Sequence, residues 1–468
     1  MPTIYPNKTL TATSADILNA IRNSATNDYK NYIPVVTADA EIIRSVGSIL
    51  MQNPSLMNEF LSALCNRIGK VLINSRLYNN PWAVFKKGVL EFGEVVEDIF
   101  VNIADVYEFD HEGGTDFAAR KMPDVRASFY AMNYEVQYKV SVSPDMFKRA
   151  FLSESGIAEL VTYITNSLYT AHANDEFLIM KYLLGVHIMD GHLKPVQVDV
   201  TAGSEKSVVK KFKEVSNKLT FLSPDYNIAG VHNFSDKGYQ YLIINSAYDA
   251  TYDVDVLASA FNMDKAEFAG HRKLVDSFGA MDVARLKKMI GSQPGYHEFS
   301  AAELSALDKI PAVIVDQNWF QMYDQTLRYT DFFNPQALYY NYYLTAFKVV
   351  AMSPFAPAAA FVPGAPSVTS VTVSPATATV AKGQHAQLSA NVVTVNFAPE
   401  AVTWYIEGTG NKTRANIPGP TSAETKIDNS GNLIVGNDET ATTLTIKATS
   451  NYDTTKSGSA TITIGAIG

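Results

Sequence analysis

Apolar residues recur with a helical period over residues 156–185, the longest such stretch that we find in the chain. About 29 residues at a rise of 1.5 Å per residue would make a helix of about 43 Å, longer than most helices of globular proteins. We therefore expect a scaffold helix here. Its apolar face follows the i, i+3, i+4, i+7 spacing and contains Ile157, Leu160, Val161, Ile164 and Leu168.

A strict alternation of apolar and polar residues predicts a half-buried strand over residues 133–142. Before it, residues 78–133 contain clusters of both charges and a glycine-containing tip at 111–116, without a long helical stripe. Two extended limbs around a charged tip indicate a long β-hairpin that leaves the body. Connections of this length in a compact domain are normally functional.

The first 50 residues indicate an arm rather than a core element. Thr13 or Ser14 can cap a short helix, and polar residues and Pro34 follow it. A second helical pattern runs over residues 55–68. Residues 208–222 predict a further helix, residues 239–244 and 312–315 predict strands, and residues 255–261 a short helix, whereas residues 274–307 stay unplaced.

Prolines at 354, 357, 363 and 366 mark a linker near the last quarter of the chain. Beyond it come short alternating runs separated by Gly, Pro and Asn, with turns every 8–12 residues, as in an immunoglobulin-like sandwich. We expect Leu388, Trp404 and Leu433 in its core. The chain thus divides into an α+β part, 1–363, and an all-β part, 367–468.

Composition and charge exclude several classes of protein. The chain has 468 residues, is 47% hydrophobic and 18% charged, and carries a net charge of −9, so we expect neither disorder nor a dedicated nucleic-acid binder. A single cysteine excludes an intrachain disulfide and a cysteine-based zinc site. We expect no signal peptide and no membrane-spanning segment.

Candidate catalytic and metal-binding residues are few. His297 and Glu298 resemble the start of a zinc helix, but the second histidine of that motif is replaced by Ala301. Asp249, Asp253 and Asp255 lack the glycine and the distal glutamate of a calcium loop. Phosphate-binding, dinucleotide-binding and nucleophile-elbow motifs are absent. We therefore expect no catalytic residue, metal ligand or cofactor, and no enzyme.

The predicted hairpin offers the residues that we expect at a contact between subunits. Trp82 and Phe85 lie beside Lys86 and Lys87, and acidic residues follow directly. Opposite charges close together on an exposed hairpin suit a self-complementary contact, in which charge sets the register. Arg120, near the tip, is added to this set.

Two family resemblances account for most of the chain. The segments VTSVTVSPATATVAKGQHAQLSANV, VTWYIEG and IDNSGNLIVGN resemble the bacterial immunoglobulin-like group 2 (BIG2) domain. The larger part resembles the major capsid protein of phi29-like podoviruses. That resemblance is carried by DILNAIRNS, FKKG, MPDV, DVDVLASAFNM, VDQNWFQMYD and NPQALYYNYY.

The second resemblance implies the HK97-like capsid fold and its assembly. That fold has an N-terminal arm (about 1–50 here), an extended hairpin called the E-loop (about 78–133), a spine helix (about 156–185), and peripheral and axial domains. It implies hexamers and pentamers of one chain in an icosahedral shell around double-stranded DNA. It further implies a scaffolding protein and a portal as partners, assembly in the host cytoplasm, and a place in the virion.

Three alternatives remain open at this point. A tail-tube subunit with an immunoglobulin-like domain would normally be shorter and mostly β, which the helix at 156–185 disfavours. A bacterial surface adhesin would need a signal peptide and an anchor. An enzyme with an accessory sandwich domain would need a catalytic constellation that we do not find.

Overall fold

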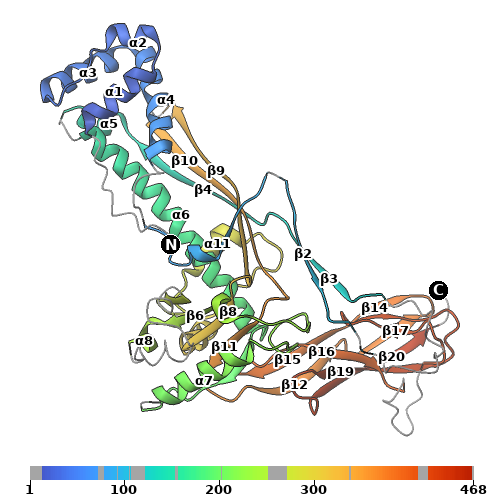
Figure 1. Cartoon of the computed structure of the whole chain (residues 1–468). Helices are drawn as coiled ribbons and strands as arrows, with labels where there is room; N and C mark the ends of the chain where they lie inside the picture. Colours follow the sequence, from blue (N-terminus) through green and yellow to red (C-terminus); the bar gives the residue numbers. More distant parts are fainter. Residues whose placement is uncertain are drawn as a thin grey trace, which may run out of the picture.

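A long helix laid along a β-sheet forms the axis of the molecule, and the other elements attach at its two ends (Figure 1). The structure, a computed structural model, describes residues 13–71, 78–91, 93–104, 106, 122–152, 156–201, 203–250, 271–336, 339–408 and 420–465. Its elements are mixed α and β. None of the helices within these ranges is both long and apolar enough to cross a membrane.

The long helix is α6 (Gly156–Met189), with 34 residues. It continues past the predicted end at Gly185. A side chain at Gly185 would meet Met281 Cε at 2.7 Å and Phe299 at 3.3 Å, so this glycine permits close packing inside the helix instead of ending it. The helix ends instead before Gly191, whose φ of +66° favours glycine.

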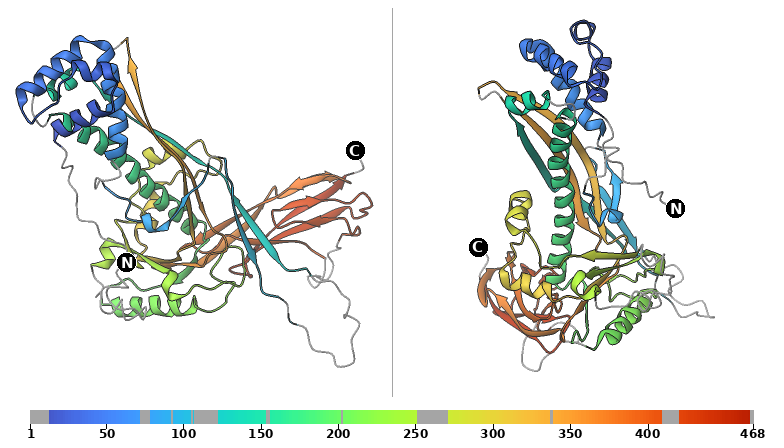
Figure 2. Two further views of the ribbon diagram at one scale, coloured as in Figure 1. Left: turned by 45° about the horizontal axis from the view of Figure 1, so that its top comes forward. Right: turned by 90° about the vertical axis from the view of Figure 1, so that its left-hand side faces the viewer.

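The sheet beside α6 has the strand order β1-β9-β10-β4. The predicted alternating strand is confirmed as β4, and it pairs antiparallel with β10 from Tyr134↔Lys348 to Val142↔Tyr340. Helix α6 packs against β4 and β10, as the right-hand view of Figure 2 shows. The four strands are β1 (Lys86–Val89), β4 (Tyr134–Val142), β9 (Phe320–Asn334) and β10 (Tyr339–Met352).

The described part of the N-terminal region is a packed helical module, not a detached arm. Ile17 and Ile21 are buried in one apolar cluster with Leu160 and Ile164 of α6, because each short helix buries its apolar stripe against its neighbours. The first helix has the expected cap, a capping box of Thr13 and Asp16. The module consists of α1 (Ser14–Ser24), α2 (Asn27–Tyr32), α3 (Ala40–Gln52) and α4 (Pro54–Val71), and α5 (Pro144–Ala150) leads into α6.

A second sheet, with strand order β5-β11-β8-β6-β7, lies at the other end of α6. Its faces alternate strictly: Ile314 packs under α7, whereas Val313 and Val315 share a core with the end of α6. Both faces are therefore covered, and every residue of β8 is buried. The strands are β5 (Lys194–Gln197), β6 (Gln240–Asn245), β7 (Arg272–Val275), β8 (Ala312–Asp316) and β11 (Ala358–Val362).

Helices flank this second sheet. The predicted helix at 208–222 is α7 (Glu205–Lys218), and a short α8 (Ser246–Asp249) follows β6. The segment 274–307, for which the sequence predicts no element, overlaps the end of β7 and contains α11 (Val283–Ile290) and most of α12 (Ala301–Asp308). The predicted helix at 255–261 lies outside the described residues.

The described residues after 366 are all β, in three small sheets around one apolar cluster. Leu388, Trp404 and Leu433 lie together in that cluster, as expected for a core. Gly431 is required beneath them, since its φ is +80° and a Cβ there would lie 3.0 Å from Trp404. The strands are β12 (Ser367–Ser374), β13 (Thr377–Ala381), β14 (His385–Gln387), β15 (Ser389–Val395), β16 (Val402–Ile406), β17 (Lys426–Ile427), β18 (Asn432–Ile434), β19 (Thr443–Ser450) and β20 (Ser457–Gly465).

Candidate assembly surfaces

The prediction that Trp82 and Phe85 contact a neighbouring subunit is wrong. Both side chains are 0% exposed in the subunit's own core. Trp82 Nε1 donates a hydrogen bond to the carbonyl of Leu274 at 3.1 Å, and the two rings contact Phe320. The turn η1 (Ala83–Phe85) leads directly into β1, which pairs with β9 and thereby places these rings inside.

Lys86 and Lys87 also bind groups of their own subunit. Lys86 Nζ lies 2.8 Å from Glu176 and 2.7 Å from Asp324. Lys87 Nζ donates to the carbonyl of Gln317 at 2.9 Å and to the side chain of Asn318 at 2.7 Å. Both lysines are still partly exposed, so their expected contact with a neighbour stays a prediction, while Arg120 lies outside the described residues.

Glu176 is the centre of a buried ion cluster that joins α6 to the sheet. Lys348 of β10 contacts both Glu176 and Asp324, and His172 Nε2 lies 3.3 Å from Glu176. Burial by itself raises the pKa of Glu176, but the hydrogen bond from His172 and the charges of Lys348 and Lys86 outweigh it and hold the pKa well below its usual range. The carboxylate thus stays charged and fixes the helix against the strand.

Within the described residues of the predicted hairpin, β2 (Val96–Val101) and β3 (Val125–Tyr130) pair with each other, whereas β1 pairs with β9. Strands β2 and β3 pair antiparallel from Val96↔Tyr130 to Val101↔Val125. They leave the body as a two-stranded ribbon (Figures 1 and 2). We call β2 and β3 the ribbon below.

One face of the ribbon packs against its own subunit. Asp98 Oδ2 accepts hydrogen bonds from Tyr130 at 3.0 Å and from Ser353 at 2.6 Å. The ring of Phe100 stacks on Phe355 with centroids 5.6 Å apart. These contacts hold the base of the ribbon in a defined direction.

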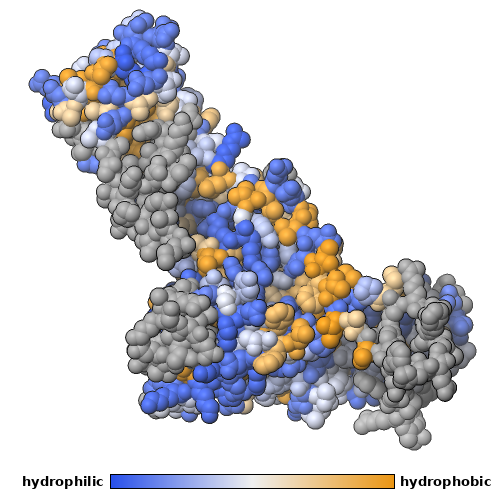
Figure 3. All heavy atoms as spheres, viewed as in Figure 1, coloured by the Kyte–Doolittle hydropathy of each residue, from blue (hydrophilic) through white to orange (hydrophobic). Residues whose placement is uncertain are grey.

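The opposite face of the ribbon is apolar and open to solvent. Phe129 is 64% exposed and Ile99 is 55% exposed, although both belong to types that are usually buried. Cross-strand pairing places Ile99 beside Ala127, Val101 beside Val125 and Phe129 beside Glu97. We call these residues the outer face; Figure 3 shows apolar side chains in this part of the surface. The sequence does not reveal this face because both faces of β2 carry apolar residues, Val96 and Phe100 on one and Ile99 and Val101 on the other.

A smaller exposed apolar group lies on the loops after α7. Phe221 and Leu222 are exposed, and so is Phe234. Ser223 and Asn233 form an isolated bridge, so these three side chains come from neighbouring segments. Exposed apolar groups of this kind are typical of surfaces that are covered in an assembly.

The described polar residues that the sequence offered for metal binding form ion pairs within the subunit. Arg272 forms an ion pair with Asp249, and His297 Nε2 lies 3.0 Å from Glu303, which also caps α12. Asp253 and Asp255 lie outside the described residues. These contacts are those of a structural framework.

Comparison with known proteins gives a consistent result. Residues 18–362 match the family model described as Phi29-like phage major capsid protein. The major capsid protein of Bacillus phage B103 is 34% identical over 449 residues, covering 94% of this chain and 91% of that protein. The major capsid protein of Bacillus phage GA-1 is 31% identical over 409 residues, covering 85% and 80%.

Solved structures with a similar arrangement include the capsid of Staphylococcus phage Andhra. It matches with a TM-score of 0.48 and 12% identity over 62% of this chain and 86% of that chain. The capsid of cyanophage P-SCSP1u matches with a TM-score of 0.40 and 8% identity over 62% and 89%. The assignment rests on the family model and the sequence relatives. This chain belongs to the phi29-like phage major capsid protein family, and it is a structural subunit of the virion shell, not an enzyme.

Proposed function

We propose that this subunit builds its shell with the HK97-like division of labour. The N-terminal helical module takes the place of the arm, the ribbon that of the E-loop, and α6 that of the spine helix. The four-stranded sheet belongs to the peripheral domain and the five-stranded sheet to the axial domain. Membership of the capsid family and the order of these elements along the chain support this assignment.

The outer face of the ribbon is the observation that carries the proposal. A phenylalanine side chain has about 200 Å² of surface, so covering an exposed ring such as Phe129 would contribute up to about 3 kcal/mol per contact. Such a contact repeats for every copy, and many modest equivalent contacts stabilise a closed symmetric assembly. The ribbon therefore contacts a neighbouring subunit through Ile99, Val101, Val125 and Phe129.

Substitution on the outer face tests this proposal. The double variant Ile99→Ser/Phe129→Ser should reduce the yield of assembled particles in sedimentation velocity runs. The melting temperature of the unassembled chain should stay unchanged, because neither side chain is buried in the subunit. Val393→Ser is the matched control, since Val393 is also an exposed apolar residue on a strand but lies in β15.

An equal effect on the control, or an equal loss of melting temperature in the double variant, would contradict the proposal. The first result would mean that a polar substitution of any exposed apolar residue impairs assembly. The second would mean that the outer face stabilises the subunit itself. Normal assembly of the double variant would exclude the ribbon as a principal contact.

The residues after 366 form, we propose, an immunoglobulin-like BIG2 domain attached to the shell part. Three observations support it: the all-β strand order, the shared core of Leu388, Trp404 and Leu433, and a family match that ends at residue 362. This domain contacts the shell part where Phe397 packs into the core beside α6 and where Pro399 lies against Gly191.

The partners that we propose follow from the role of a container. The net charge of −9 suits a wall that encloses DNA without binding its sequence, because an acidic surface repels phosphates. A scaffolding protein and a portal would set the size of the shell and the entry of the genome. Assembly takes place in the host cytoplasm before the shell becomes part of the virion.

A further inference from the structure

The end of α6 brings two histidines into contact through its backbone. The N–H of His192 bonds to the carbonyl of His187 at 2.9 Å, and the N–H of Gly191 bonds to the carbonyl of Ile188 at 3.1 Å. With Gly191 at φ +66°, this is a Schellman motif, in which the third residue from the helix end meets the second residue beyond it. That pair is usually apolar. Here it consists of two imidazoles.

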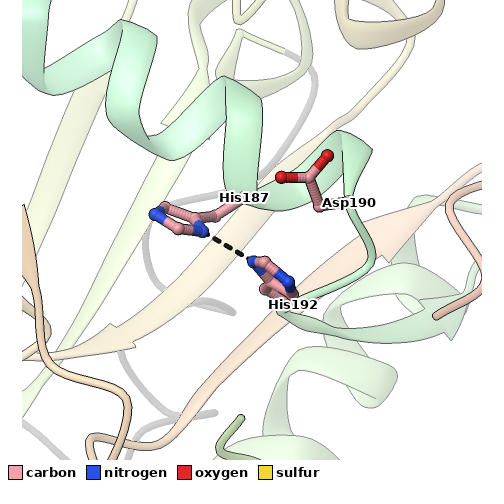
Figure 4. A group of neighbouring side chains, drawn as sticks. All are labelled: His187, Asp190 and His192. Carbon is pink, nitrogen blue, oxygen red and sulfur yellow. Dashed lines mark hydrogen bonds between the residues drawn. The ribbon is translucent and has the colours of Figure 1, made fainter. Parts of the chain in front are cut away.

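The three polar side chains of this turn form a compact group (Figure 4). His187 Nδ1 lies 2.8 Å from His192 Nδ1, and a ligand atom of Asp190 lies within 4.8 Å of both rings. The ring of His187 stands edge-on to buried Trp319, which limits its rotation.

We propose that His187, Asp190 and His192 bind a divalent transition-metal ion such as Zn²⁺. Two imidazole nitrogens and one carboxylate oxygen are a donor set that suits this ion, with a fourth position left open. Bonds of about 2.0–2.1 Å in a tetrahedron require ligand atoms about 3.3 Å apart, so the nitrogens need to separate by about 0.5 Å. The Asp190 carboxylate oxygen, which lies within 4.8 Å of a ligand nitrogen of each histidine, must come within the same distance.

The surroundings favour a cation and give it access. His187 and Asp190 line a surface hollow of about 320 Å³, through which an ion can enter. Glu303 and Glu400 lie within electrostatic range of Asp190, with His297 as a further titratable neighbour. Among the described lysines and arginines, none forms an ion pair with Asp190.

Metal binding here would connect the shell part to the residues after 366. Gly191 lies so close to the following part that a Cβ would stand 2.5 Å from Pro399 Cα, and Glu400 is the next residue. A bound ion would fix the turn against this segment. The site thus acts as a junction between α6 and the C-terminal domain.

Equilibrium dialysis of the full-length, untagged protein against Zn²⁺ and Co²⁺ near pH 7 tests the proposal. We expect one ion per chain, and for Co²⁺ the visible absorption bands of a four-coordinate site. His192→Gln and Asp190→Asn should each weaken binding at least about tenfold. His385→Gln is the control, because His385 is exposed in β14 and outside this turn.

Asp190→Asn keeps the test decisive if His192→Gln fails to fold, because Asp190 is exposed. Binding that is equal in the wild type and in both variants would overturn the proposal. Absence of stoichiometric binding to the wild type would overturn it as well. Binding that is lost in His297→Gln but retained in Asp190→Asn would place the ion at Glu303 instead.

Discussion

Replacing Lys348 with methionine removes a positive charge from the ion cluster between α6 and the sheet. The Lys348 side chain is 2% exposed and that of Glu176 is 6% exposed, so water cannot replace the lost ammonium group. Methionine retains most of the aliphatic chain, and the packing around it changes little. The substitution therefore isolates the electrostatic contribution of this lysine.

The expected loss of stability depends on the charges that remain around Glu176. Removing one partner of a buried ion pair usually costs about 3–5 kcal/mol, because the other charge stays buried. Lys86 still lies 2.8 Å from Glu176 and is 24% exposed, so part of the compensation survives. We expect the free energy of unfolding of the shell part to fall by about 2–3 kcal/mol.

Urea titration followed by tryptophan fluorescence measures this cost. Trp82 and Trp319 lie in the core that also contains the C-terminal part of α6, so they report unfolding of the shell part. In the Glu176→Gln background Lys348→Met should cost at least about 1 kcal/mol less, because the two groups are coupled. The control is Lys287→Met, whose ion pair with Glu298 is solvent-exposed, and its midpoint should not change.

Two results would refute this reasoning. One is a midpoint shift for Lys348→Met that is no larger than that of the control. The other is an equal cost of Lys348→Met with and without Glu176→Gln. Either result would mean that the cluster does not hold α6 against the sheet.

Two more predictions concern acid and truncation. The pKa of Glu176 is lowered in the fold, so its stabilisation is present above the unfolded-state pKa of about 4.3 and is lost as pH falls below it. Glu176→Gln should therefore lose less stability than the wild type between about pH 5 and 3 in urea titrations, and an equal loss would contradict the assignment. A chain ending at residue 363 should stay folded by circular dichroism, with a lower melting temperature because it lacks Phe397. An insoluble or unfolded product would show that the two parts fold as one unit.

The elements that sequence patterns predict well are those whose signal is local. The long helix and the strand Tyr134–Val142 each bury one face along their whole length, so the apolar period is visible. The predicted end of α6 at Gly185 is wrong, because this glycine permits close contact with Phe299, a residue far along the chain. The packing of the N-terminal helices is not visible in the sequence, because short amphipathic helices gain most of their stability from tertiary contacts.

The residues that we expected at a subunit contact are harder to predict, because the burial of Trp82, Phe85 and Lys86 depends on residues far along the chain. Lys86 looked like a surface charge, but its partner Glu176 lies 90 residues away. The outer face is not visible in the sequence because both faces of β2 carry apolar residues. The contact between the two histidines could be predicted from the sequence, because a glycine after a long helix indicates the motif that brings His187 and His192 together.

Cryo-electron microscopy of the purified chain, alone and with a scaffolding protein, tests the central claim most directly. We predict closed icosahedral particles in which the outer face of the ribbon, with Phe129, lies against a neighbouring copy of the chain. Particles in which Phe129 faces solvent, assembly into tubes only, or a chain that stays monomeric with the scaffold present would contradict the account.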